Sequence, residues 1–469
     1  MLKTLSLAKK FKRLDIINLK NDYPEEFGRF VMALKNLEES DDWYRICGIH
    51  GNTFKPDDPK VLCPTDPKIV SFIAETGEPQ YCKHKVYDFI AWHVPYVYQF
   101  ELLLNKYNTS KNKDYITLPY MDLTNFSDDF TFLNDPKIII TYDSKKIIID
   151  NPLASAYYYK DGVKTKITRN GFLTPKTKKE RIQLNTVKKE LNNALYATSY
   201  ETFSSYPVSY TPSNVVSDYI PLETPHNTLH DVIGGDGGNM GDISVSAFDP
   251  LFWLHHCNMD RHFYTWLYNN TEHFQDSIYP AKIDKDLFLS TQAPFFDSGI
   301  YNWDFNNYKY GWQNKDPKYM LLRDTLKFEI FPYTYDIIKP TPFVPVKNFI
   351  ELIDIPIPEE SVLISVYIHL KSEKLNKELH FAGSGFWFGI NRQNKFCKRC
   401  GITRTNFKID IDEYIKMMST DTHGLNKINY IDYNFVIEGN GKMIKDSNVF
   451  NVYSQDQLIK DGSMKIVIN

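Results

Sequence analysis

Eight of the 12 histidines in this 469-residue chain lie in two short windows. The first window contributes His50, His84 and His93, and the second contributes His226, His230, His255, His256 and His262. A single buried histidine is usually a hydrogen-bonded core residue, but clustering of this kind indicates metal ligands. Neutral imidazole nitrogens suit copper and zinc, whereas magnesium and calcium prefer oxygen ligands. The sequence therefore predicts two neighbouring sites with three imidazoles each.

The spacing within each window indicates how the imidazoles can meet. His226 and His230 are separated by one helical turn, so both lie on the same face of a helix. A histidine of the next helix can complete this group. His84 and His93 are separated by about 2.5 helical turns and cannot share a helix face. We therefore expect His84 to precede the helix that carries His93.

Apolar periodicity and capping residues predict the elements that position these side chains. Residues 24–40 and 86–105 have helical spacing, and Pro95 predicts a kink in the second of these helices. Two further helices are expected to start at Thr224-Pro225 and Asp249-Pro250, with Thr or Asp as the N-cap and Pro in the first turn. The other expected elements are a short helix before His50, a helix at 181–205, a strand in FKRLDIINLK and a hairpin in KIIITYDSKKIIID.

The chain is expected to form two domains. Residues 1–340 are predicted to form a mainly α catalytic domain, a four-helix bundle around a dinuclear metal site. A proline-rich stretch, KPTPFVPV, then marks the boundary. Short alternating segments such as SVLISVYIHL, NFVIEG and MKIVIN predict a smaller, β-sandwich-like domain over residues 341–469.

Charge and cysteine content limit the classes of partner. With 55 basic and 58 acidic residues the net charge is -3, which favours neither nucleic acid nor a membrane surface as a partner. Six cysteines are too few for a disulfide scaffold in a chain of this length. The N-terminal apolar stretch is too short for a signal-peptide core, so a cytoplasmic location is expected. A small-molecule substrate and a homo-oligomer are both compatible with these features.

Several segments together resemble the tyrosinase family of type 3 copper proteins, in particular its fungal branch. Residues 249–260, DPLFWLHHCNMD, are similar to its second copper signature, and residues 84–93, HKVYDFIAWH, are similar to its first. RLDIINLKND, GIHG and LETPHNTLH also fit, so the resemblance covers about residues 12–340. Val94 departs from the arginine that the family usually has after the second ligand, which puts a local salt bridge in doubt.

The resemblance implies two copper ions per chain, held by six histidines: His50, His84 and His93 for one ion, and His226, His230 and His256 for the other. Spacing alone leaves the choice between His255 and His256 open, and the copper signature selects His256. Asp260 falls on the position of the acid that follows this ligand. On the same helix face as His256, Asp260 is a candidate acceptor for the second ring N–H of a ligand.

The activity that the resemblance implies is copper-dependent oxidation of phenols with O2. Monophenols would be hydroxylated in the ortho position, and o-diphenols would be oxidised to o-quinones, as in melanin formation. Glu223 and Asn227 match the pair that holds a water poised to deprotonate the phenol, although Glu223 also suits the ordinary role of an acid at a helix N-terminus. Asp231 occupies a pocket-rim position, where an acid would favour cationic phenols.

Cys82 precedes His84 by two residues, and in the fungal family this spacing accompanies a thioether bond between the cysteine sulfur and the histidine ring. Such a bond would lock the orientation of the ring. Two alternatives remain, because Cys82 could be a free buried thiol, and Cys-x-His is also a metal-ligand spacing.

The C-terminal domain resembles the pro-domain that covers the copper site of fungal tyrosinases, so the chain is expected to be a zymogen cleaved within about residues 335–360. Phe388, or secondly Phe386, is expected to place a ring in the pocket as a substrate mimic. Both could instead be strand core residues. Cys397 and Cys400 form a lone CxxC pair, for which a redox role, zinc binding and chance remain open. Its thiolates suit Cu(I), and the resemblance to fungal pro-domains implies a role in copper loading.

Three other functions remain open at this point. A haemocyanin-type O2 carrier would share the copper pair, and a catechol or o-aminophenol oxidase would lack the hydroxylation step. A zinc hydrolase would need only one set of three histidines, so the duplicated set counts against it.

Overall fold

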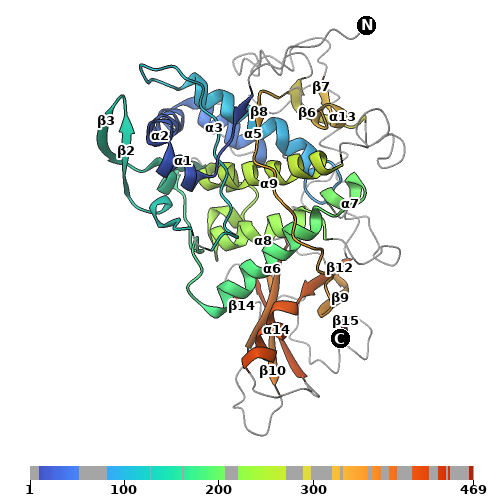
Figure 1. Cartoon of the computed structure of the whole chain (residues 1–469). Coiled ribbons are helices and arrows are strands. Elements are labelled where there is room, and N and C mark those ends of the chain that lie inside the picture. Colours follow the sequence, from blue (N-terminus) through green and yellow to red (C-terminus); the bar gives the residue numbers. More distant parts are fainter. Residues whose placement is uncertain are drawn as a thin grey trace.

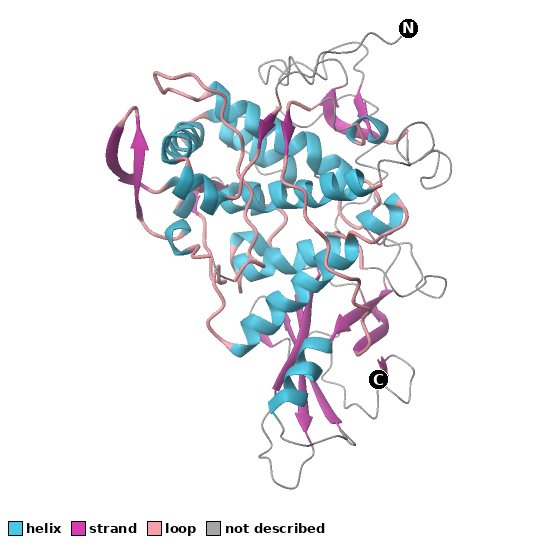
Figure 2. Ribbon diagram, in the orientation of Figure 1, coloured by secondary structure: helices cyan, strands magenta, loops and turns pink. Residues whose placement is uncertain are grey.

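The structure, a computed structural model, describes residues 10–51, 82–126, 128–160, 163–205, 220–270, 289–296, 319–327, 331–356, 362–370, 380–387, 404–421, 431–439, 442–443 and 464–467. Helices dominate the first two thirds of these residues, and strands dominate the rest (Figure 2). The helices of the first part are α1 (Ile16–Asp22), α2 (Pro24–Glu38), α3 (Asp41–Gly51), α5 (Phe89–Lys106), α6 (Lys178–Ala194), α7 (Tyr200–Ser204), α8 (Glu223–Gly234), α9 (Pro250–Asn269) and α13 (Leu322–Thr325).

The helical part has one continuous core around α5 and α9, which pack against each other (Figure 1). Both helices are apolar on nearly every side, because α2, α8 and the 3-10 turn η5 (Ser246–Phe248) cover them. Pro95 lies inside α5, as expected. At the start of α9, the Asp249 carboxylate accepts the Leu251 N–H at 2.9 Å, and Pro250 occupies the first turn, which confirms the predicted start of this helix.

Small two-stranded sheets accompany the helical core. The predicted hairpin forms as β2 (Lys137–Tyr142) and β3 (Lys145–Asp150), and β2 packs on α2. The remaining pairs are β4 (Tyr157–Lys160) with β5 (Val163–Lys166), β6 (Thr291–Phe296) with β7 (Tyr319–Leu321), and β1 (Phe11–Lys12) with β8 (Tyr333–Thr334). The parallel β1–β8 pair joins the beginning of the helical part to its end.

Three expectations about local structure were wrong. The segment predicted as a strand, FKRLDIINLK, has only the two residues of β1 and then turns into α1, because the Asp15 side chain caps that helix through the Ile17 N–H. The helix expected at 181–205 is divided into α6 and α7, and Ser199 caps the second piece. Helix α8 begins at Glu223 after Leu222, without a side-chain cap, so Thr224 is not its N-cap.

The C-terminal strands form two separate sheets. One has the order β11-β10-β13-β14 and the other β12-β9-β15. The bounds are β9 (Phe349–Pro356), β10 (Val362–Leu370), β11 (His380–Trp387), β12 (Arg404–Asp410), β13 (Ile431–Gly439), β14 (Lys442–Met443) and β15 (Met464–Val467), with helix α14 at Asp412–Asp421. The sandwich arrangement of the two sheets and the domain boundary at residue 340 stay predictions.

The C-terminal strands lie beneath α6 and α8 in Figure 1, and β11 packs on both helices. The connecting segment is fixed to α6 by two asparagine side chains. Asn192 accepts the Thr341 N–H at 2.8 Å and donates to the Thr341 carbonyl at 3.1 Å, and Asn193 holds Val344 through its N–H and carbonyl in the same way. Among the described helices, none has the length and apolar character needed to cross a bilayer.

Candidate metal centre

Three imidazole nitrogens of the second histidine window converge on one point. The Nε2 atoms of His226 and His230 lie 3.1 Å apart, and each lies 3.2 Å from Nε2 of His256. His226 and His230 come from successive turns of α8, and His256 comes from α9. A metal ion about 2.0 Å from each nitrogen, the usual metal–imidazole distance, fits just above this triangle.

The protonation of these rings also suits a cation. His230 Nδ1 donates to the Met240 carbonyl at 2.8 Å, and His226 Nδ1 lies 2.9 Å from Asn227 Oδ1. With the proton on Nδ1, each Nε2 presents a lone pair to the others. Burial lowers the pKa of His230 to about 4 and lowers the pKa of His226 as well, so the rings are neutral near pH 7. Three converging lone pairs repel one another unless a cation lies between them.

His255 borders this group without joining the triangle. A nitrogen of His255 lies within 4.8 Å of ligand nitrogens of the other three histidines. Its ring stacks on His226 with centroids 5.0 Å apart, and its Nε2 has no hydrogen-bond partner in the part of the chain that the structure describes. The Nε2 triangle therefore favours His256 over its neighbour.

The first window forms a second group from three different segments. His50 lies in the last turn of α3, His93 in the first turns of α5, and His84 in the loop before α5, as the spacing predicted. Their ring centroids are 5.6 to 5.9 Å apart, nearly an equilateral triangle. His50 Nδ1 donates to the Ile243 carbonyl at 3.0 Å, and His93 Nδ1 donates to the Phe89 carbonyl at 2.7 Å. Their Nε2 atoms thus carry lone pairs as well.

The two groups lie against each other. The rings of His93 and His256 stack with centroids 4.3 Å apart, and those of His84 and His226 are 5.7 Å apart. Burial lowers the pKa of His93 to about 3. Two neutral imidazole groups in contact, with no carboxylate within either group, form a dinuclear site for soft or borderline cations.

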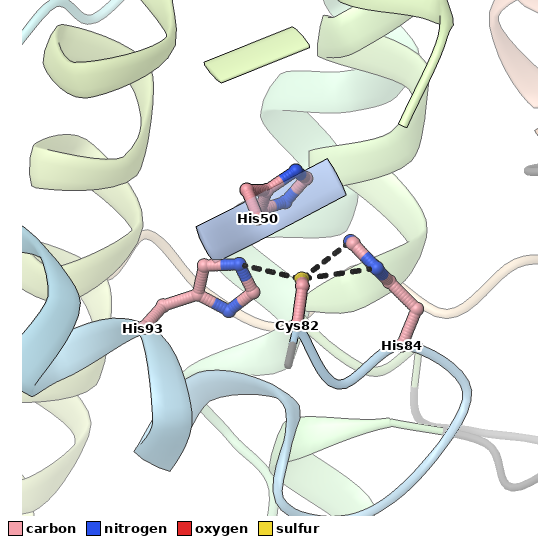
Figure 3. Close-up of side chains that lie close together, drawn as sticks. All are labelled: His50, Cys82, His84 and His93. Carbon is pink, nitrogen blue, oxygen red and sulfur yellow. Dashed lines mark hydrogen bonds between the residues drawn. The ribbon is translucent and has the colours of Figure 1, made fainter. Parts of the chain in front are cut away.

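Cys82 belongs to the first group (Figure 3). Its Sγ lies 3.3 Å from His84 Nδ1 and 3.9 Å from His84 Nε2, so the sulfur faces the ring edge whose central atom is Cε1. It also lies 3.4 Å from His93 Nε2. The sulfur can thus meet the carbon that a thioether would use, and it is near enough to the nitrogens to leave thiolate ligation open.

The structure gives Glu223 and Asn227 defined partners. The Glu223 carboxylate accepts the Lys85 N–H at 2.8 and 3.1 Å, and it also accepts the Ser205 hydroxyl. Burial raises the pKa of Glu223 to about 7. Asn227 orients His226, as described above. Both side chains are buried beside the histidines, and their holding of a water stays a prediction.

Asp260 does not have the expected partner. Its Oδ2 accepts from Arg13 Nη1 at 2.9 Å and from the hydroxyls of Tyr333 and Tyr335 at 2.8 Å each. His256 Nδ1 has no hydrogen-bond partner among the described residues. Asp260 thus joins the residues after the N-terminal strand to the end of the helical part, and it makes no hydrogen bond to His256.

The other predicted residues have different outcomes. Asp231 lies half-buried on α8, and its carboxylate accepts from Gln183 Nε2 at 3.3 Å. Phe388, Cys397 and Cys400 lie outside the described residues. Phe386 is buried, and a Cβ placed on Gly241 would lie 3.7 Å from its Cζ. This ring therefore covers the turn whose Met240 carbonyl holds His230.

Sequence reasoning missed the backbone carbonyls that hold the rings. The carbonyls of Met240 and Ile243 come from the loop between α8 and α9. The only signal for this loop was its glycine-rich sequence. Gly235 has a φ of 62°, and a Cβ there would lie 2.4 Å from backbone atoms of residues 170 and 171. The close turn directs the loop back under the histidines.

Residues 40–269 match the family model described as the common central domain of tyrosinase. A tyrosinase of Neurospora crassa is 28% identical over 344 residues, which is 62% of this chain and 49% of that protein. The chain thus spans about half the length of the curated relatives that it matches. Recombinant mushroom tyrosinase superposes with a TM-score of 0.65 at 18% identity, covering 98% of this chain and 94% of that one. Deoxygenated haemocyanin from Rapana thomasiana superposes with a TM-score of 0.62 at 19% identity, and the match covers 98% of this chain and 100% of that one.

Proposed function

Because this chain belongs to the tyrosinase and polyphenol oxidase family of type 3 copper proteins, we propose that it oxidises phenols with O2 at a pair of copper ions. The observation that carries this proposal is the contact between two groups of neutral imidazoles in one buried core. A hydrolytic zinc enzyme would need one such group, whereas two groups would hold two copper ions, which together could supply two electrons to O2.

The copper ligands are assigned to three imidazoles in each group. His50, His84 and His93 hold one ion, and His226, His230 and His256 hold the other. Copper supplies the binding and activation of O2, and the chain supplies coordination and substrate position. The buried aromatic shell, in which Phe252 lies 4.1 Å from His256 and 4.8 Å from His50 between ring centroids, keeps water out of the site.

The finer activity is the ortho-hydroxylation of monophenols followed by oxidation of the diphenol to an o-quinone. A phenol must lose its proton before it can bind copper, and a base with a pKa near the working pH transfers that proton best. Glu223 meets this requirement, because burial raises its pKa to about 7. Asn227, with its Oδ1 on His226, would complete the position of a water between them.

The Cys82 sulfur faces Cε1 of His84, which supports a thioether between them. The C-terminal strands are proposed to form a β-sandwich-like lid that must be cleaved or displaced for activity. The packing of β11 on α8 and of Phe386 over Gly241 supports this lid. Phe388 as the substrate mimic and Cys397 with Cys400 as a copper-loading pair remain parts of the same proposal.

Reversible O2 binding of the haemocyanin type is the second candidate, because a haemocyanin superposes over 98% of this chain and 100% of its own length. A catechol or o-aminophenol oxidase is the third. Copper-loaded, protease-trimmed protein should consume O2 with both tyrosine and its ortho-hydroxylated form. Turnover of the diphenol alone would indicate a catechol oxidase, and binding of O2 without turnover would indicate a carrier. Glu223→Gln should lower the monophenol rate by about 100-fold or more and change the diphenol rate little.

A further inference from the structure

The short loop that carries Cys82 and His84 is held from outside the copper site. Residues 82–88 form no helix or strand, and yet this loop must place a sulfur and an imidazole within 3.3 Å of each other. Cys82 and His84 both point toward the metal site (Figure 3), and Lys83 lies between them in the sequence.

Lys83 is buried, with its side chain 4% exposed, and its Nζ lies 3.2 Å from Asp88 Oδ2. A buried ammonium is stable only when it is paired. The partner Asp88 is itself fixed, because its Oδ1 accepts from Gln292 Nε2 at 2.9 Å and from the Ser290 hydroxyl. The ion pair thus ties the loop to the segment at 290–292, which is remote in sequence.

Asp88 is also the residue from which α5 starts. It occupies the N-cap position, but its side chain makes no capping hydrogen bond to the helix. An aspartate at this position usually caps the helix. Here the carboxylate instead binds Lys83, Ser290 and Gln292. One turn further on, α5 carries His93, so the same carboxylate links the loop of one ligand to the helix of another.

The other end of the loop is held by the backbone. Lys85 has a φ of 54°, a left-handed conformation that is uncommon for a residue with a side chain, and its N–H donates to Glu223 at 2.8 Å. The peptide units on both sides of His84 are therefore fixed, one through a side chain and one through a backbone donor. Little freedom remains for the His84 ring or for the sulfur beside it.

We propose that the Lys83–Asp88 ion pair positions Cys82 against His84 and thereby controls formation of their thioether. This inference rests on the proposed copper function. In the reaction the Cys82 S–H and the His84 Cε1–H bonds break and an S–Cε1 bond forms. The two electrons reduce dioxygen, and with the two released protons they give hydrogen peroxide. The chain becomes lighter by two hydrogen atoms.

The test follows the intact mass and the thiol content of the full chain after copper and air are added to metal-free protein. Lys83→Met and Asp88→Asn should form the thioether about 10- to 100-fold more slowly than the wild type, because small misplacements cost that much in a proximity-driven step. Lys83→Arg, which keeps the charge, should restore the rate in large part. Asp88→Asn keeps the hydrogen-bonding side chain and serves as the second variant if Lys83→Met folds poorly.

A matched control lies at the other end of the same helix. Lys106 pairs with Asp42 at 2.7 Å, far from the loop, and Lys106→Met should form the thioether at the wild-type rate. Equal rates in the wild type, Lys83→Met and Asp88→Asn would overturn the proposal. A wild-type chain that binds two coppers but keeps all its thiol would also overturn it and leave the copper function standing. Failure of the wild type to bind copper would reject both.

Discussion

The proposed C-terminal lid makes buried contacts with α6, and these contacts are expected to hold the lid closed over the metal site. Lys189 on α6 pairs with Asp410 Oδ2 at 2.6 Å and with Asp412 Oδ2, and its side chain is 8% exposed. Asp412 in turn accepts the N–H groups of Lys347 and Asn348. Lys189→Met removes the cation and leaves two carboxylates facing each other in a buried place.

The free-energy cost of Lys189→Met follows from the burial of the ion pair. Removing one partner of a buried ion pair costs about 3–5 kcal/mol. We take the lower end, because Asp412 keeps its backbone donors and its side chain is 16% exposed. A loss of about 3 kcal/mol in the closed form raises the open fraction by about 10²-fold, until the open form predominates.

The assay is the initial rate of O2 uptake with a catechol, measured on the copper-loaded full chain and expressed as a fraction of the rate after proteolytic trimming. We expect this fraction to rise by about 10²-fold, or to saturate, in Lys189→Met. Lys137→Met, which removes an ion pair that is 69% and 86% exposed, should leave it unchanged. An unchanged fraction in Lys189→Met, with a lowered melting temperature, would refute the reasoning.

Three further predictions concern the same interface and the copper ligands. Burial and the nearby Asp410 raise the pKa of Glu190 from 4.5 to about 8. The proton on Glu190 therefore stabilises the closed form fully below pH 4.5, and this stabilisation is lost as the pH rises to about 8. The activity of the untrimmed chain should rise over that range, and Glu190→Gln should flatten the rise. His256→Ala should reduce the copper content to about one ion per chain, whereas His255→Gln should keep two; metal analysis decides between them. Gly51→Ala places a Cβ 2.0 Å from the Ser244 carbonyl, so it should lower both the melting temperature and copper binding at the first site.

The sequence predicted the local features of the site better than its tertiary contacts. Asp249-Pro250 predicted the start of α9, and the one-turn spacing of His226 and His230 predicted a shared helix face, because both signals lie within a few residues. The start of α8 was misplaced by the Thr224-Pro225 pair. The helix begins one residue earlier, at Glu223, whose carboxylate accepts the Lys85 N–H.

The contacts that could not be foreseen join residues remote in sequence. Asp260 was expected to orient His256 because both lie on one helix, but its partner Arg13 comes from the opposite end of the helical part. The carbonyl of Ile243 that holds His50 and the Lys83–Asp88 pair depend in the same way on how segments pack. Side-chain chemistry predicted which histidines lie together, and only the fold showed what fixes them.

The central claim is that two adjacent imidazole groups bind two copper ions that react with O2. Metal analysis of the copper-loaded chain, combined with an absorption spectrum before and after addition of hydrogen peroxide, tests it most directly. We predict two coppers per chain and a new intense near-ultraviolet band, and the His230→Ala variant should lose the band and keep about one copper per chain. One copper per chain, or two coppers without a band, would contradict the claim.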